Sequence, residues 1–181
     1  MTKEALIQEI HTAFKDVTVD DGIGLWEGQG VDDYADAKTM ADLRRKDERN
    51  NWDNMSYKGL EYCHSSLSFF DAKGMRFCLP KFLIFDILEE QLYKEQGVTP
   101  PDVTFTLGYN LHEEYQQTRF SLLNNPQIQS IIHFLEYKVQ QVVAKYKAYS
   151  ADYSSNMDAI YSYSEYVELN KTLNEWKQKL N

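Results

Sequence analysis

The sequence has only two cysteines, Cys63 and Cys78, and they lie fifteen residues apart. This spacing matches neither a redox C-x-x-C motif nor the closely spaced ligand pairs of a zinc site. Long apolar runs are also missing, since the longest, Phe82 to Phe85, is far too short to cross a bilayer. No signal peptide is visible ahead of the first amphipathic segment. We therefore expect a cytoplasmic protein with reduced thiols and no membrane association.

Basic residues are outnumbered, with 19 Lys and Arg against 28 Asp and Glu and a formal net charge of −9. Non-specific binding to nucleic acid depends on Lys and Arg that displace counterions from phosphates. The only dense basic run, Arg44 to Lys46, is followed at once by Asp47 and Glu48. We therefore expect neither nucleic acid nor an anionic membrane as a partner. An acidic protein attracts basic proteins instead.

The chain has 181 residues, of which 43% are apolar and 14% aromatic, including 13 Tyr. A chain of this length can bury a hydrophobic core without metals or disulfides, so we expect a single domain over residues 1–181. Tyrosine suits both partly wet cores and binding surfaces. Gap filling between helices is the favoured interpretation of the tyrosines, and a binding surface is the alternative.

Apolar residues at helical spacing predict helices over residues 3–15, 38–50, 81–96, 126–149 and 157–180. Thr2 is the expected N-cap of the first helix. Pro80 is expected to open the third helix and Gly97 to close it. A short polar segment joins the last two helices, which predicts an antiparallel helical hairpin.

Alternating residues predict strands between the second and third helices. Ser66 to Leu79 resembles a β-hairpin whose turn is Asp71 to Gly74. Val103 to Leu107 also alternates and can add a third strand, whereas residues 112–123 are ambiguous between strand and helix. The expected fold class is therefore α+β, mainly helical, with about five helices around a small antiparallel hairpin or three-stranded sheet.

Four glycines lie between Asp20 and Gly30, but they do not form a phosphate-binding loop. Glu27 occupies the third glycine position of the dinucleotide fingerprint, and the Gly-Lys-Ser/Thr end of a P-loop is missing. The segment is interpreted as an irregular connection around Leu25 and Trp26.

No recognised catalytic or metal-binding motif is found among the candidate residues. The four histidines lie outside known motifs, and Cys63 and His64 are only sequence neighbours. The acidic run that includes Asp32, Asp33 and Asp36 lacks the glycine and closing glutamate of a calcium loop. The interpretation leans away from an enzyme and includes no cofactor and no metal.

Four residues are nevertheless candidates for binding a ligand: Arg76, Asp71, Asp47 and Trp52. Arg76 lies within an apolar segment, where it either points outward or pairs with an acid such as Asp71 or Asp47. A structural pair is favoured over an anion-binding role. Trp52 closely follows two acidic residues and is either a core anchor or a platform for a ligand.

Phe69 to Pro80, F-F-D-A-K-G-M-R-F-C-L-P, resembles the pattern F-L-D-x-x-G-[FM]-R-F-Y-L-P-A of an uncharacterised bacterial family. Leu123 to Glu136, which includes Pro126 and Gln127, resembles the L-x-x-x-Q and F-L-E parts of the same family. The segment ending in Ala13-Phe14 and the pair Asp47 and Trp52 also fit. Cys78 and Lys81 depart from the pattern, where the family has an aromatic and a small residue. The resemblance implies a small bacterial cytoplasmic protein and no particular activity.

Three functional hypotheses remain open. The first is a protein-interaction module, including an immunity-type protein that neutralises a basic toxin. It follows from small size, acidity, abundant aromatic residues and the missing catalytic motif. The alternative is a small-molecule-binding protein or enzyme with a pocket around Arg76, Asp71, Asp47 and Trp52. The third is a mimic of DNA that binds DNA-binding proteins.

Overall fold

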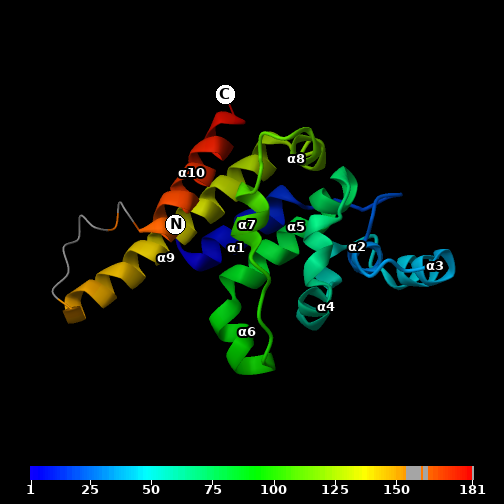
Figure 1. The fold of residues 1–181 in the computed structure, drawn as a ribbon, viewed down its shortest axis with the longest axis horizontal. Coiled ribbons are helices and arrows are strands. Elements are labelled where there is room, and N and C mark those ends of the chain that lie inside the picture. Colours follow the sequence, from blue (N-terminus) through cyan, green and yellow to red (C-terminus); the bar gives the residue numbers. More distant parts are fainter. Residues whose placement is uncertain (154–159, 161–162, 181) are drawn as a thin grey trace.

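The computed structural model describes residues 1–153, 160 and 163–180, and every regular element in this part of the chain is a helix (Figure 1). The expected α+β class is therefore wrong, because no strand occurs among the described residues. Two 3-10 segments, η1 (Trp52–Asn54) and η2 (His64–Ser68), accompany the following α-helices: α1 (Lys3–Ala13), α2 (Leu25–Asp32), α3 (Ala37–Lys46), α4 (Tyr57–Tyr62), α5 (Ala72–Ile87), α6 (Glu89–Gln96), α7 (Val103–Gly108), α8 (Glu114–Arg119), α9 (Asn125–Tyr153) and α10 (Ser164–Gln178).

The segment expected to form the β-hairpin is instead η2 followed by the central helix α5. Asp71 is the N-cap of α5 rather than a turn residue, and its Oδ1 accepts a hydrogen bond from the Gly74 N–H at 2.8 Å. Twelve of the sixteen residues of α5 are buried, including Pro80, which lies inside the helix and does not open it. A helix that is apolar all round has no helical period in its sequence, so its hydrophobic residues can be mistaken for alternation.

The expected third strand is also helical. Asp102 caps α7, and its Oδ1 accepts hydrogen bonds from the Phe105 N–H at 2.8 Å and from the Thr104 hydroxyl at 2.7 Å. Strand propensity in Val-Thr-Phe-Thr is therefore overridden by capping and by packing against α10. The ambiguous segment at residues 112–123 contains the short helix α8.

The glycine-rich segment contains α2, so its interpretation as an irregular connection is wrong. Glycine lets this helix pack closely against its neighbours. A Cβ on Gly28 would lie 3.0 Å from the Ser66 Cβ in η2, and a Cβ on Gly30 would lie 2.5 Å from Leu43 Cδ1 in α3. The predicted helix at residues 38–50 is confirmed as α3 but ends earlier, at Lys46, so Asp47 lies outside it.

The first helix and the long C-terminal helices agree with the sequence. Thr2 caps α1 through a 3.2 Å bond from the Ala5 N–H, and α9 packs against both α1 and α10. Figure 1 shows α9 and α10 side by side and running in opposite directions, which confirms the predicted hairpin. Helix α9 extends past the predicted end at residue 149 to Tyr153. The predicted start of the last helix, Met157, lies outside the described residues.

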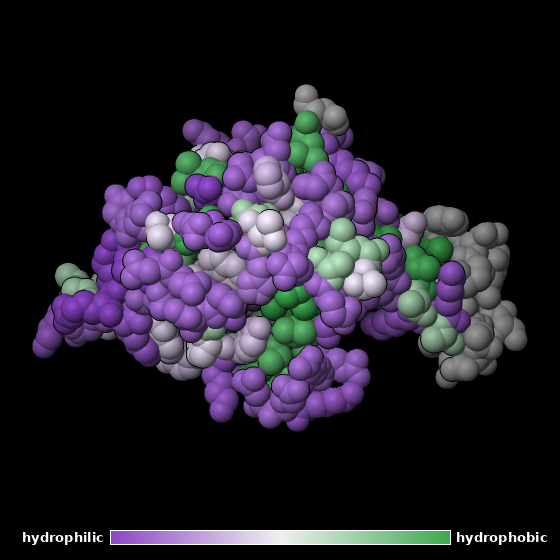
Figure 2. Space-filling view, turned by 180° about the vertical axis from the view of Figure 1, so that it is seen from behind, coloured by the Kyte–Doolittle hydropathy of each residue, from purple (hydrophilic) through white to green (hydrophobic). Residues whose placement is uncertain are grey.

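A continuous cluster of buried apolar side chains runs through the described elements from Leu6 in α1 to Trp176 in α10. Trp176 is completely buried, and its indole N–H donates a 2.9 Å hydrogen bond to the Leu107 carbonyl, which ties α10 to α7. Figure 2 shows that the face behind the view of Figure 1 is mostly hydrophilic, with apolar side chains in separate patches. Among the described residues, no helix is both long enough and apolar enough to span a membrane.

Candidate functional site

Asp47, the first of the four candidate residues, lies just beyond α3 and holds the start of α2. Its carboxylate oxygens accept hydrogen bonds from the Trp26 N–H at 2.6 Å and from the Glu27 N–H at 3.3 Å. Burial raises the pKa of Asp47 to about 6, against the opposing effect of these two N–H donors. The carboxylate therefore satisfies backbone donors at a helix N-terminus that would otherwise lack partners.

Asp71 reaches the same glycine-rich segment from the other side. In addition to its bond with Gly74, its Oδ1 accepts the Ile23 N–H at 3.1 Å. A Cβ on Gly74 would lie only 2.1 Å from the Ile23 carbonyl oxygen, so glycine is needed at this motif position for close packing. Asp47 and Asp71 thus bind backbone N–H groups at the two ends of one segment, residues 23–27.

Trp52 and Arg76 form a second group, at the C-terminal end of α1. The indole N–H of Trp52, which is buried, donates to the Phe14 carbonyl at 2.9 Å, and its ring stacks on His11. Arg76 Nε donates to Gln127 Oε1 at 3.2 Å, and Gln127 Nε2 donates to the Ala13 carbonyl at 3.2 Å. Trp52 and Gln127 therefore satisfy carbonyls at the end of a helix, which lack partners within it.

The segments that carry the family resemblance meet at this point. Arg76 comes from the first motif, Gln127 from the second, and both connect to the end of α1. The expected pairing of Arg76 with an acid is not found, because Arg76 takes part in none of the ion pairs of the described residues. The structure gives each of the four candidates a packing partner, and their role in binding a ligand stays a prediction.

The two cysteines are buried thiols. Burial raises the pKa of Cys63 to about 12 and raises that of Cys78 well above its usual value. His64 lies next to Cys63 in the sequence, but its Nδ1 is 3.4 Å from the Tyr62 carbonyl oxygen. Because the thiolate is the nucleophilic form of cysteine, neither thiol is prepared for nucleophilic chemistry at neutral pH.

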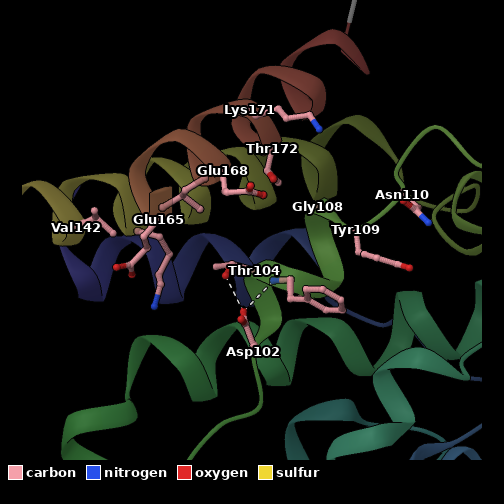
Figure 3. A pocket seen from close by; sticks show the side chains of 13 residues that line it. Asp102, Thr104, Gly108, Tyr109, Asn110, Val142, Glu165, Glu168, Lys171 and Thr172 are labelled. Atoms are coloured by element: carbon pink, nitrogen blue, oxygen red, sulfur yellow. Dashed lines mark hydrogen bonds between the residues drawn. The ribbon is translucent and has the colours of Figure 1, made fainter. Parts of the chain in front are cut away.

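A cleft of about 410 Å³ lies between α7, α9 and α10, on residues that the sequence did not single out (Figure 3). Figure 3 shows Glu165, Glu168 and Thr172 on α10 along one side and Asp102, Gly108 and Tyr109 in and beside α7 along the other. A Cβ on Gly108 would lie 2.3 Å from Thr172 Oγ1, so glycine allows α7 and α10 to approach closely next to the cleft.

Two exposed aromatic rings line this cleft. Phe105 and Tyr109 are 58% and 52% exposed, and their ring centroids stack 4.9 Å apart. Large aromatic side chains that remain in water on a folded protein are candidates for contact with a partner. Both rings also line a smaller adjoining pocket of about 160 Å³, beside Tyr115, which is 56% exposed.

Acidic groups dominate the charge around the cleft. Asp102, Glu165 and Glu168 contribute carboxylates, while Lys138 and Lys171 contribute ammonium groups. Lys138 Nζ lies 2.8 Å from Asp86 Oδ1, which is itself nearly buried, so its charge is already balanced. Burial raises the pKa of Asp86, and the nearby Lys138 opposes this shift. The cleft therefore combines aromatic surface with a local excess of negative charge.

Sequence reasoning missed the cleft because it assigned residues 103–107 to a strand. The available signal was Asp102 followed by Thr104 and Phe105 after two prolines, which is a pattern typical of a helix N-cap. Within the described part of the chain, no group of three or more His, Cys, Asp or Glu is arranged to hold a metal ion.

In the part of the chain that the structure describes, the fold is all-helical and the site is an acidic, aromatic cleft. A family model described as a family of unknown function (DUF6714) matches residues 2–168, and the chain belongs to this family. The expected membership of a family without an assigned activity is confirmed at this level, while the motif comparison itself stays a prediction. Comparison with curated proteins found no match, and comparison with solved structures found none either.

Proposed function

We propose that the protein is a protein-interaction module that binds a basic partner at the cleft between α7, α9 and α10. The observation that carries this proposal is the exposed, stacked pair of Phe105 and Tyr109 beside three carboxylates. The net charge of −9 supports it, because an acidic protein attracts basic partners and accelerates their encounter.

A lysine or arginine side chain of the partner fits the chemistry of this cleft. Its cationic head is attracted to the face of an aromatic ring, and its methylene groups can cover apolar surface. Hydrogen bonds from the same cation to Asp102, Glu165 or Glu168 are charge-assisted and therefore stronger than neutral ones. Lys171 opposes such binding, since it places a positive charge on the rim.

An immunity-type role, in which the protein neutralises a basic toxin, is the specific form of this function that we propose. Neutralisation needs tight binding at a small number of strong contacts, and aromatic residues together with charge complementarity provide such contacts. The chemistry of the cleft favours partners that present lysine or arginine side chains, and experiment identifies the partner.

The first test is affinity capture of the tagged full chain from its host's lysate, followed by measurement of the affinity for the captured protein. We expect a stoichiometric basic partner whose binding weakens by at least about tenfold in the double variant Glu165→Gln, Glu168→Gln. Charged hydrogen bonds contribute about 1.5–3 kcal/mol each, which sets this lower limit.

The matched control is Glu90→Gln, Glu95→Gln on α6, which removes the same charge from exposed side chains that do not line the cleft. Equal losses in both double variants would mean general charge attraction and would contradict a specific cleft. Capture of no basic protein would contradict the module itself and favour the small-molecule hypothesis around Arg76.

A further inference from the structure

Arg119 is a buried cation in the smaller pocket, next to the cleft. Only 3% of its surface is exposed, and all three of its hydrogen bonds go to uncharged oxygens. Its Nε donates to the Phe70 carbonyl at 3.2 Å, and one terminal nitrogen donates to Gln116 Oε1 at 2.9 Å. The other terminal nitrogen donates to the Leu67 carbonyl.

No carboxylate balances this charge within the part of the chain that the structure describes. Burial lowers the pKa of Arg119 from its ordinary value, and the Tyr115 side chain opposes this shift. A guanidinium has five N–H groups, so two remain without an acceptor among the described residues. Burying a charge without a counter-charge is costly unless an anion can approach it.

The pocket that Arg119 lines contains further donors. Gln116 is 6% exposed, and its Nε2 has no hydrogen-bond acceptor among the described residues, although its Oε1 is bonded to Arg119. Thr106 and Ser68, which carry hydroxyl groups, also line this pocket. Tyr115 forms one wall, with its hydroxyl donating to the Ser68 carbonyl at 2.7 Å and its ring 5.2 Å from the Arg119 guanidinium.

We infer that this pocket binds a single carboxylate group, held by Arg119 and assisted by the Gln116 amide. The planar guanidinium matches a carboxylate, and a hydrogen bond between these groups is charge-assisted. The volume of about 160 Å³ suits one small group rather than a large ligand. The inference is independent of the proposed basic partner, because it concerns a different pocket and the opposite charge.

The charge balance favours a monoanion over a phosphate. Arg119 supplies one positive charge, Glu113 on the same rim supplies a negative one, and the whole chain carries −9. A phosphate group carries up to two negative charges at neutral pH and would meet this repulsion twice. A carboxylate carries a single negative charge and meets this repulsion only once.

The test is an NMR titration of the full chain with sodium acetate, with sodium chloride at equal ionic strength as the reference. We expect saturable shifts at the Arg119 side-chain Nε–H and at the amides of Thr106 and Gln116. Gln116→Glu replaces the amide that accepts a hydrogen bond from Arg119 with a carboxylate of the chain itself. It should weaken acetate binding by about tenfold or more, because the site is then already neutralised.

Glu113→Gln is the control for Gln116→Glu, because it removes a negative charge from the pocket lining instead of adding one. It should retain or tighten acetate binding, since the removed charge repels acetate. Thr106→Val is a second variant that leaves the Arg119 bonds intact and should weaken binding severalfold if Gln116→Glu does not fold. Acetate shifts no larger than those of chloride would overturn the inference. Equal acetate affinity in wild type and Gln116→Glu would overturn it as well.

Discussion

At the scale of single residues, buried ionisable groups carry structural tasks in this protein. Asp47 accepts two N–H groups at the start of α2 and is only 9% exposed, so its charge is poorly solvated. Glu27 lies close enough to raise the Asp47 pKa further, and Arg49 lowers it. The sum of these effects is a carboxyl group with a pKa of about 6, which titrates just below neutral pH.

The first prediction concerns the pH dependence of stability through Asp47. The folded chain binds this proton more firmly than the unfolded chain, whose carboxyl has a pKa near 3.8. The stabilising contribution is therefore complete below pH 3.8 and is lost as pH rises through about 6. At its maximum, below pH 3.8, this contribution to the free energy of unfolding is about 3 kcal/mol.

Asp47→Asn replaces the titrating carboxyl with an amide that does not titrate, and it keeps a side-chain oxygen as an acceptor. We expect the free energy of unfolding of the wild type to rise relative to the variant as pH falls from 7 to 4, measured by urea denaturation at each pH. Other titrating groups, such as Asp86, are present in both proteins and cancel in the difference. Parallel curves for the two proteins would contradict the assigned shift.

At the scale of the helices, short polar side chains cap the N-termini of several elements. Thr2, Asp36, Asp71 and Asp102 each accept a backbone N–H in the first turn of the helix that follows. Asp36 caps an exposed helix, α3, whereas Asp71 caps α5, which lies in the core. Asp71 also bonds the Ile23 N–H and so joins α5 to the segment before α2.

The second prediction compares two of these caps. Asp71→Ala should lower the free energy of unfolding by about 2 kcal/mol, because it removes the cap of the central helix and the bond to Ile23. Asp36→Ala should cost about 1 kcal/mol or less, since the exposed helix α3 can fray without disturbing the core. Urea denaturation measures both values. Equal costs would show that Asp71 has no role beyond an ordinary cap.

At the scale of the whole molecule, Gln127 connects helices that are far apart in the sequence. Its side chain is completely buried and bonds to Arg76 of α5, the Ala13 carbonyl of α1 and the Asn124 N–H before α9. The two segments that resemble the family pattern therefore meet at a junction of three helices. The contacts of Arg76 and Gln127 give both residues a packing role.

The third prediction tests this junction. Gln127→Leu has similar bulk but leaves the Ala13 carbonyl and the Asn124 N–H without their partner, so we expect a loss of about 2–4 kcal/mol in urea denaturation. Arg76→Ala is the comparison, and it should cost about 1 kcal/mol or less, because it removes one bond of a half-buried side chain. A larger loss for Arg76→Ala than for Gln127→Leu would contradict this assignment.

The Arg76→Ala variant also tests the small-molecule hypothesis. A metabolite that binds the wild type and not this variant would favour a pocket around Arg76, Asp71, Asp47 and Trp52. Unchanged binding across a metabolite panel would remove Arg76 from that hypothesis.

Much of the helical structure could be predicted from local signals, and the errors have physical causes. The first helix, the start region of α3 and the long C-terminal pair carry an apolar stripe or a cap that is visible in the sequence. Helix α5 carries no such stripe because it is buried on nearly every side. Asp47 and Asp71 were singled out as candidates for binding a ligand, which stays a prediction, and their hydrogen-bond partners, Trp26 and Ile23, are brought close only by folding.

The sequence by itself determined the negative charge, the absence of long apolar runs and the caps that begin several helices, because these depend on residue type and near neighbours. Only the tertiary structure decided that residues 66–79 contain the end of η2 and the start of α5 instead of two strands, that Arg76 and Gln127 meet, and that Asp102 lies across a cleft from Glu165. The physical reason is that burial and long-range hydrogen bonds outweigh local propensity, and both depend on which distant segments pack together.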